Sequence, residues 1–199
     1  MGRKKLIITH ECPYHIVVRS NNREWFYLPI EEIWSVFSYL SGEVGTRFEF
    51  AIHAFVLMNN HYHMLASTSK NHSLPKVMEW FQRSANRLIN DRANRINHVF
   101  GGPYKACLIE SDIYYFHALK YVFLNPVTAG IVARAEDYRF SSLNSMDIST
   151  CSLISPIAGL IPKRLDKLIE LLNEEYSFED YKTVKTAIAK KQFKFPARM

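Results

Sequence analysis

The chain has 199 residues, of which 25 are Lys or Arg and 19 are Asp or Glu, so its formal net charge is +6 with neutral histidines. Hydrophobic residues make up 48% and charged residues 22%, which excludes a disordered chain and predicts a packed core. The length fits one domain, with or without an appendage. The basic excess favours a polyanionic partner such as nucleic acid.

The cysteines and the lengths of the apolar runs indicate in which cellular compartment the protein acts. The cysteines are odd in number, widely spaced and without a CxxC pair: Cys12, Cys107 and Cys151. They predict reduced thiols rather than a disulfide scaffold. The stretch Leu6–Ile8 is too short for a signal peptide, and the apolar runs at 51–58 and 153–161 are too short to span a membrane. We therefore expect a cytoplasmic protein with no membrane partner.

The first part of the chain alternates strand and helix signals. A β-rich stretch precedes a basic loop, apolar residues at helical spacing precede a Ser-Gly stop, and two β-prone runs flank the turn pair Asn-Asn. These signals predict a strand, a loop, a helix and a β-hairpin, at 14–18, 19–23, 30–41 and 48–58 with 61–66.

The next part predicts a long helix, a strand and a second helix. Ser73 caps a helix with Pro75 in its first turn and an apolar stripe that runs to Ile89. A strand follows at 104–109, and a helix begins near Ser111. We expect that helix to end at Asn125, because Pro126 disfavours helical geometry in the residue before it.

The order β-α-β-β-α-β, followed by a helix, is typical of the ferredoxin-like split βαβ pattern, an α+β fold with an antiparallel sheet. We expect helices on one face of the sheet and a free face for a ligand. Composition changes near Ser149, and apolar residues of 165–172 and the cap Ser177-x-x-Asp180 predict two further helices before the basic segment 190–194. We therefore divide the chain into a domain at 1–148 and a helical extension at 149–199.

A His-Tyr-His tripeptide directly follows the hairpin turn. The two-residue period of a strand places His61 and His63 on one face, with Cα atoms about 7 Å apart, so they could share one metal ion or simply be two exposed histidines. A two-residue turn places Met58 opposite His61. His53 then lies on the other face of the sheet from His61 and His63, as a core or edge histidine. A register shift of one residue would reverse the orientation of His53.

A second candidate pair lies at the end of the helix that starts near Ser111. Tyr121 and Asn125 are four residues apart, so they share one helix face and present a phenol and an amide together. The alternative is a packing tyrosine and an asparagine that ends the helix.

These motifs together resemble the single-tyrosine HUH-nuclease transposases of the insertion-sequence type, and among them the REP-associated tyrosine transposases. The resemblance covers roughly residues 12–143. It is carried by the motifs at 14–16, 19–24, 54–65, 98–105, 120–132 and 137–142.

The resemblance implies a transposase that cleaves and rejoins structured single-stranded or hairpin DNA. It implies that His61 and His63 bind a divalent ion, Mg²⁺ or Mn²⁺, that Tyr121 is the nucleophile, and that Asn125 completes the ligand set. The expected products are a 5′-phosphotyrosine and a free 3′-hydroxyl. A monomer and a homodimer with composite sites are both compatible with the sequence.

The chain departs from the family pattern at three positions. Asn59 replaces the usual proline before the asparagine of the HUH strand, and Ser20 replaces a common glycine. Met58 stands where some relatives have a carboxylate, so the third metal ligand depends on Asn125 alone. Tyr114, seven residues before Tyr121, is the alternative nucleophile.

Candidates for contacts with DNA are polar or basic, with phosphate contact as the expected mode and a solvated surface as the alternative. They are Arg19, Asn22, Arg23, Arg83, Arg87, Lys105 and Arg139. Two other functions compete with the transposase. One is a catalytically silent nucleic-acid-binding protein, and the other is a metal-dependent phosphodiesterase without a covalent intermediate.

Overall fold

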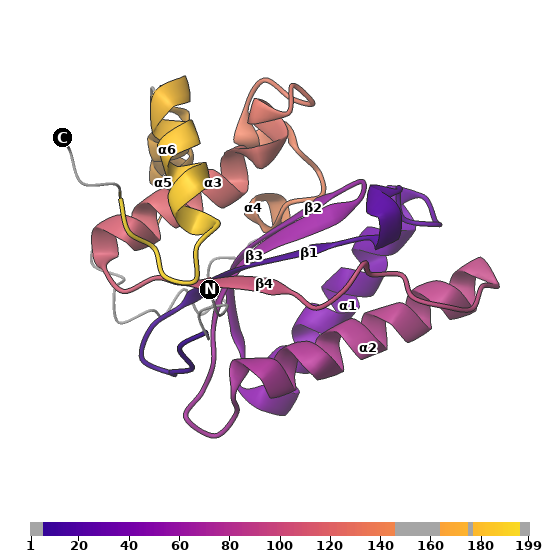
Figure 1. Ribbon diagram of the computed structural model, residues 1–199. Coiled ribbons are helices and arrows are strands. Elements are labelled where there is room, and N and C mark those ends of the chain that lie inside the picture. The colour runs from indigo at the N-terminus through magenta and orange to yellow at the C-terminus, as the bar shows by residue number, and fades with distance from the viewer. Residues whose placement is uncertain (1–5, 146–163, 175–176, 196–199) are drawn as a thin grey trace.

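The computed structural model describes residues 6–145, 164–174 and 177–195 (Figure 1). Its strands are β1 (Tyr14–Arg19), β2 (Ala51–Met58), β3 (His61–Ser67) and β4 (Lys105–Leu108). Its α-helices are α1 (Ile30–Phe48), α2 (Leu74–Ala93), α3 (Asp112–Thr128), α4 (Ser142–Ser145), α5 (Leu165–Asn173) and α6 (Phe178–Ile188). Two short 3-10 helices are η1 (Asn21–Arg23) and η2 (Ala135–Asp137).

The four strands form one antiparallel sheet in the order β2-β3-β1-β4. This is the ferredoxin-like topology that the order of elements predicts, so the expected fold class is confirmed. The β2–β3 hairpin has the expected two-residue turn at Asn59–Asn60, and Met58 pairs with His61.

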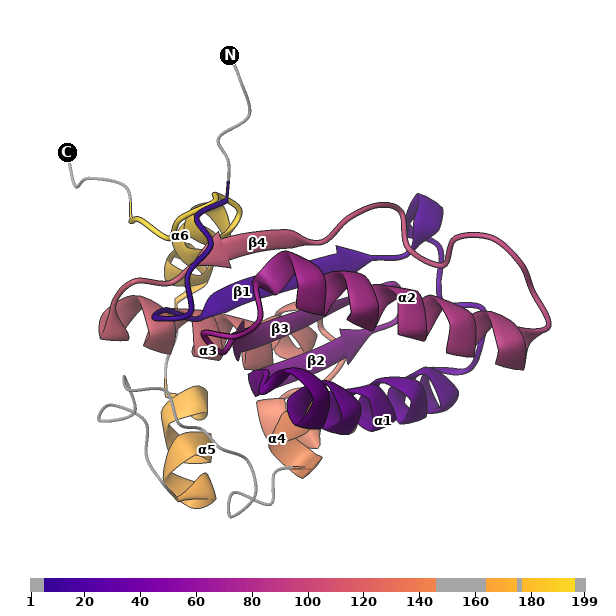
Figure 2. The same cartoon turned by 90° about the horizontal axis from the view of Figure 1, so that it is seen from below.

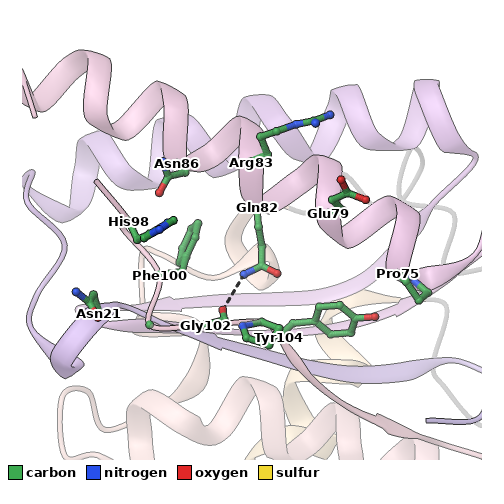
Figure 3. A pocket seen from close by; sticks show the side chains of 12 residues that line it. Asn21, Pro75, Glu79, Gln82, Arg83, Asn86, His98, Phe100, Gly102 and Tyr104 are labelled. Atoms are coloured by element: carbon green, nitrogen blue, oxygen red, sulfur yellow. Dashed lines mark hydrogen bonds between the residues drawn. The ribbon is translucent and has the colours of Figure 1, made fainter. Parts of the chain in front are cut away.

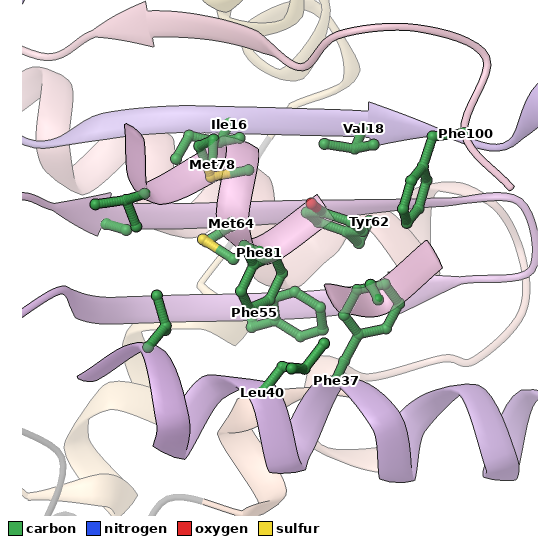
Figure 4. Packing of buried hydrophobic residues seen from close by; sticks show 14 of the residues in the cluster. Ile16, Val18, Phe37, Leu40, Phe55, Tyr62, Met64, Met78, Phe81 and Phe100 are labelled. Atoms are coloured by element: carbon green, nitrogen blue, oxygen red, sulfur yellow. The ribbon is translucent and has the colours of Figure 1, made fainter. Parts of the chain in front are cut away.

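Helices α1 and α2 cover one face of the sheet (Figure 2). Strand side chains such as Tyr62 and Met64 point into this layer, where they meet Phe37 of α1 and Phe81 of α2 (Figure 4). The ring centroids of Phe37 and Tyr62 are 4.9 Å apart, in the edge-to-face arrangement that aromatic pairs prefer. This layer is the main apolar core.

The opposite face of the sheet is covered as well, which corrects the expectation of a free face. Helices α3, α5 and α6 lie over it (Figure 1), and Val56, Leu65 and Cys107 form part of a second apolar cluster there. Because these strand residues are apolar, leaving them in water would cost free energy, and α3 supplies the cover. The stretch of α3 from Ala118 to Pro126 is buried, as expected for a helix that is apolar all round.

Two helix ends differ from the sequence expectation. Helix α1 continues past the Ser-Gly pair at 41–42 to Phe48, because Val44 and Phe48 extend its buried stripe. Their burial outweighs the helix penalty of about 1 kcal/mol for a glycine. Helix α3 contains Pro126 and ends at Thr128. Gly130, two residues later, has a φ of 69°, which suits a glycine after a helix.

A later segment pairs with part of each edge of the sheet. At the β2 edge, the Leu57 amide donates to the Phe140 carbonyl, 2.9 Å away, and the Tyr138 hydroxyl donates to the Leu57 carbonyl. At the β4 edge, the Leu108 amide donates to Lys191, and the Phe193 amide donates back to Leu108. Covered edges do not offer unpaired backbone groups to other chains.

The described part of the C-terminal segment packs on the domain. Leu168 and Leu172 of α5 join the second apolar cluster. The buried Lys120 ammonium of α3 donates to the carbonyl groups of Leu171 and Glu174 at the end of α5. The run at 153–161 lies outside the described residues. Among the described helices, none is both long and apolar enough to cross a bilayer.

Two cysteines fall in the described part of the chain, and both are free thiols. Cys12 is half-buried and Cys107 is buried. Cys151 lies outside the described residues.

Candidate active site

The two histidines of the HxH tripeptide lie side by side on the face of the sheet that α3 covers. The ring centroids of His61 and His63 are 5.1 Å apart. Tyr62, between them, points into the opposite layer. The pleat of β3 therefore places both imidazoles together, as its two-residue period predicts.

Each imidazole is held through its Nδ1 atom. His61 Nδ1 lies 2.7 Å from the side-chain oxygen of Asn60, and because that oxygen only accepts, His61 carries its proton on Nδ1. His63 Nδ1 lies 2.9 Å from Nε2 of His15, a buried residue of β1. Such contacts fix ring orientation and, in His61, leave Nε2 with its lone pair.

The environment keeps these histidines neutral. Burial lowers the pKa of His15 to about 3. Burial, with help from the Arg19 cation, lowers the pKa of His61 to about 4. Burial also lowers the pKa of His63 well below its ordinary value, and His15, His61, Arg19 and Lys185 add to the effect. Neutral imidazole is the form that binds a metal ion.

Tyr121 of α3 lies against this cluster. Its ring centroid is 5.6 Å from those of His15 and His63, and its ring stacks on Tyr181 of α6 at 5.1 Å. Burial raises the pKa of Tyr121, as do the charge and the hydrogen bond of Tyr181. The alternative nucleophile, Tyr114, instead contacts an aromatic cluster near the C-terminal end, with its ring 4.8 Å from that of Phe193.

The carboxamide of Asn125 is engaged within its own helix and with α6. Its nitrogen donates to the Tyr121 carbonyl at 2.7 Å and weakly to the Val122 carbonyl at 3.5 Å, which Pro126 leaves without an amide donor. Its oxygen accepts from the Tyr181 hydroxyl at 3.3 Å. Asn125 thus explains how α3 continues through a proline, and no contact among the described residues joins it to His61 or His63.

A pocket of about 330 Å³ opens between the sheet, α3 and α6. We call it the catalytic pocket, and its lining includes His15, Val17, Arg19, His63, Lys105, Tyr121, Lys185, Lys190 and Lys191. The five basic side chains make it suited to a phosphate group. Among the described residues, no group of three or more His, Cys, Asp or Glu side chains could hold a metal ion.

The DNA-contact candidates separate in space. Arg19 and Lys105 line the catalytic pocket, while Asn22 and Arg23 line a neighbouring hollow of about 350 Å³ with them. Arg83 lines a third pocket beside α2. The remaining two candidates line none of these three hollows: Arg87 lies exposed on α2, and Arg139 places its guanidinium over Phe140 beside the β2 edge.

His53 lies on the same face of the sheet as His61 and His63, the face that α3 covers, and not on the opposite face as predicted. A register irregularity between Ile52 and Ala54 turns its side chain over, so its Nδ1 lies 2.8 Å from the Tyr115 hydroxyl and its Nε2 lies 2.6 Å from Ser67 Oγ. The prediction of a core histidine is confirmed, and the predicted orientation is wrong because of this bulge.

The residues around the site that were not among the sequence candidates include His15, Asn60, Tyr181 and Lys185. The two-residue period of β1 places His15 on one face with Arg19, so that signal was available. Asn60 adjoins His61 directly. Tyr181 and Lys185 gave no signal, because helical periodicity does not say where α6 docks.

Comparison with known proteins places the chain in a family. The model of the family described as "Transposase IS200 like" matches residues 8–122. No curated protein matches significantly. The structure of a REP-associated tyrosine transposase bound to a REP hairpin is similar in fold, with a TM-score of 0.61, 18% identity, and coverage of 79% of this chain and 90% of that one.

A second solved structure is more distant. It is the crystal structure of a protein assigned as a transposase from Deinococcus radiodurans R1, with 11% identity, a TM-score of 0.42, and coverage of 58% of this chain and 89% of that one. The family match, which spans more than half of the chain, decides the assignment. The protein belongs to the IS200-like transposase family, whose members are DNA-cleaving enzymes.

Proposed function

We propose that this transposase cleaves and rejoins single-stranded or hairpin DNA through a covalent bond between Tyr121 and a 5′-phosphate. The observation that carries the proposal is the position of Tyr121, whose ring lies beside His63 in a pocket lined by five basic side chains. The solved structure of similar fold is bound to a REP hairpin, which supports a hairpin as the substrate. We also propose that the protein acts on DNA in the cytoplasm.

In this proposal, His61, His63 and Asn125 would hold a divalent cation such as Mg²⁺ or Mn²⁺. His61 offers a lone pair on Nε2 because its Nδ1 proton is held by Asn60, and His63 offers the same when its Nδ1 donates to His15. Asn125 is the third ligand in this proposal once its oxygen is released by Tyr181. A bound cation would polarise the scissile phosphate and offset the charge that develops on it.

The protein side chains perform the transfer. The Tyr121 oxygen attacks phosphorus, a new oxygen–phosphorus bond forms, and the bond from phosphorus to the 3′-oxygen breaks. The proton lost by the phenol balances the proton that the leaving 3′-oxygen gains. Rejoining is the reverse, with a 3′-hydroxyl attacking the phosphotyrosine, so no external energy source is needed.

Basic side chains from two parts of the chain stabilise the phosphate. Arg19 and Lys105 come from neighbouring strands, and Lys185 comes from α6. They lie in a partly enclosed pocket, where their charges act more strongly than they would in open water. Arg19 also lowers the pKa of Tyr121, against the larger effect of burial.

Tyr121 and the histidines beside it come from the same chain. Tyr121 reaches His63 of its own sheet at 5.6 Å, which supports action as a monomer rather than as a homodimer with composite sites. Size-exclusion chromatography of the active fraction tests this part of the proposal.

The test of the reaction is a covalent adduct. Labelled hairpin oligonucleotides are incubated with protein and Mn²⁺ and resolved on a denaturing gel, where an adduct migrates with the protein. Tyr121→Phe removes only the hydroxyl, so the adduct should vanish while DNA binding stays within a few-fold.

Tyr114→Phe is the matched control from the same helix and should keep the adduct. An adduct that survives in Tyr121→Phe and disappears in Tyr114→Phe would assign the nucleophile to Tyr114. DNA binding without any adduct in the wild type would favour the catalytically silent binding protein. Cleavage that persists in Tyr121→Phe without an adduct would favour the phosphodiesterase.

A further inference from the structure

One side chain joins the loop after β1 to a proposed metal ligand. Asn60, in the turn between β2 and β3, donates from its amide nitrogen to the Arg23 carbonyl oxygen at 2.7 Å. The side-chain oxygen of Asn60 lies 2.7 Å from Nδ1 of His61. A single residue therefore contacts both the loop at 20–24, here called the η1 loop, and the cluster of histidines.

The η1 loop decides which atom of Asn60 faces His61. A backbone carbonyl oxygen only accepts hydrogen bonds, so the contact with Arg23 turns the amide nitrogen of Asn60 toward the loop. The side-chain oxygen is left for His61, and because this oxygen also only accepts, the imidazole proton lies on Nδ1. The lone pair of Nε2 is then available to a cation.

The backbone of the η1 loop has a conformation that its own residues do not favour. Asn22 and Arg23 have φ angles of 53° and 60°, in the left-handed region that residues with a Cβ atom adopt at a cost in free energy. Such a conformation persists only where surrounding contacts hold it. The side chain of Asn60 makes its contact at Arg23, one of these two residues.

Backbone contacts hold the start of the loop. The Ser20 amide donates to the Asn60 carbonyl at 2.8 Å, and the Asn21 amide donates to the Val99 carbonyl at 2.9 Å. Asn21 lies at one end of the pocket beside α2 (Figure 3). The start of the loop is therefore held without the side chain of Asn60, so a variant at this position should loosen Arg23 and leave the loop attached.

The η1 loop also forms a wall of the hollow of about 350 Å³ beside the catalytic pocket. Arg23 lines this hollow together with Arg19 and Lys105, and these three cations suit the phosphates of a DNA strand. A phosphate in the hollow favours the loop conformation that presents Arg23. Because Asn60 links that conformation to the tautomer of His61, a phosphate and a cation favour the same local structure.

We propose that Asn60 is a positioning residue that makes DNA binding and cation binding cooperative. It holds the η1 loop in the conformation that presents Arg23 to a phosphate, and it holds His61 in the tautomer that binds a cation. A hairpin should therefore raise the affinity for the cation, and by linkage the cation should raise the affinity for the hairpin by the same factor. This inference rests on the proposed function, because it takes His61 as a metal ligand.

The experiment measures this cooperativity factor in the Tyr121→Phe background, so that the DNA stays intact. Hairpins are first selected from a random stem–loop pool by binding to the protein. Mn²⁺ affinity is then measured by electron paramagnetic resonance with and without the hairpin, and hairpin affinity by fluorescence anisotropy with and without Mn²⁺. The two factors should agree, at about tenfold.

Asn60→Asp keeps an acceptor for His61 but has no amide donor for Arg23. Its Mn²⁺ affinity without DNA should stay within a few-fold of the reference protein or rise, while the cooperativity factor should fall to about threefold or less. Asn59→Asp is the matched control, because it places the same charge in the same turn and the Asn59 side chain makes no hydrogen bond with any described residue. The control should keep the full factor.

The tautomer of His61 is measured without metal or DNA. Long-range ¹H–¹⁵N correlation spectra of the metal-free protein should place the His61 proton on Nδ1 in the wild type and in Asn60→Asp. Asn60→Ala, which removes the acceptor, should show both tautomers and bind Mn²⁺ about tenfold more weakly. Melting temperatures of all variants are measured in parallel.

Each outcome decides between the two proposals. Equal cooperativity factors in Asn60→Asp and Asn59→Asp would overturn the role of Asn60 and leave the proposed function standing. Independent binding of Mn²⁺ and the hairpin, or a His61 proton on Nε2 in the metal-free wild type, would have the same consequence. A wild type that forms no covalent adduct and binds no Mn²⁺ would overturn the proposed function itself.

Discussion

The two faces of the same sheet carry different chemistry. In β1, Tyr14, Ile16 and Val18 point toward α1 and α2 and are almost fully buried in the main core. The residues that alternate with them, His15, Val17 and Arg19, line the catalytic pocket on the other side. Because alternate residues of a strand face opposite ways, the core and the site share the same backbone without sharing side chains.

The packed layer under α1 and α2 therefore positions the residues of the site on the other side of the sheet. His61 and His63 lie on β3 on either side of Tyr62, which packs against Phe37 and Phe81. A site on strands is held more firmly than a site on loops. The face that α3 covers, here called the second face, is also apolar in part. Its cluster of histidines and Tyr121 is therefore enclosed rather than open to water.

The largest effect on function should come from the second face. His61→Ala removes an imidazole that is half-buried near the turn, so folding should survive, with a melting temperature within a few degrees of the wild type. Loss of a proposed metal ligand should reduce cleavage about 1000-fold or more, since a bound cation supplies several kcal/mol of charge stabilisation. Gel assays of hairpin cleavage measure this, and full cleavage by the variant in chelator-treated buffer would contradict the metal assignment.

The largest effect on stability should come from the opposite face, here called the first face, which α1 and α2 cover. Phe81 is fully buried and packs its ring against Phe37 at 5.9 Å and Tyr62 at 6.2 Å (Figure 4). Phe81→Ala should lower the free energy of unfolding by about 3–5 kcal/mol, the cost of the lost transfer energy and the cavity. Urea unfolding followed by circular dichroism gives the value. A loss below about 1 kcal/mol would mean that this layer is not the main core.

The two faces were not equally open to prediction from sequence. The strands, the hairpin turn and the shared face of His61 and His63 follow from local signals, namely alternation and the Asn59–Asn60 turn. The inversion of His53 does not, because a β-bulge depends on how β2 pairs with β3. The placement of Tyr181 also depends on tertiary packing, since an amphipathic helix specifies a buried stripe but not the surface that buries it.

Acid should destabilise the fold through the second face. Burial lowers the pKa of His53 to about 4 in the folded protein, against 6.5 for the exposed side chain. The unfolded chain therefore takes up a proton between pH 6.5 and pH 4 that the folded chain cannot, so stability falls as pH drops through this window. By pH 5 the loss from His53 should be about 2 kcal/mol.

His53→Gln isolates this contribution, because other buried histidines act in the same direction. The variant keeps a side chain that can hydrogen-bond Tyr115 and Ser67 but does not titrate. Urea unfolding at pH 7 and pH 5 should show a smaller difference for the variant than for the wild type. Equal differences for the two proteins would show that His53 does not contribute to the acid sensitivity.

Salt dependence should distinguish the hollow lined by Asn22, Arg23 and Lys105 from the opposite edge of the sheet. If Lys105 and Arg23 each contact a phosphate, the slope of log affinity against log salt should flatten by about 0.7 for single-stranded DNA on removal of either. Arg139→Ala should leave the slope unchanged, because Arg139 lies over Phe140, beside the β2 edge. Fluorescence anisotropy over a salt series measures all three variants. The reverse pattern would move the DNA path to the β2 edge.

The smallest effect should come from Tyr181, where α6 meets the site. Its hydroxyl donates to the Asn125 oxygen at 3.3 Å, while its ring stacks on Tyr121. Tyr181→Phe keeps the stack but releases the Asn125 oxygen, so Mn²⁺ should bind a few-fold more tightly and cleavage should rise a few-fold. Tyr114→Phe, which removes a phenol hydroxyl elsewhere on the second face, should change neither quantity. A decrease in cleavage by Tyr181→Phe at unchanged melting temperature would instead make this hydroxyl a participant in the reaction.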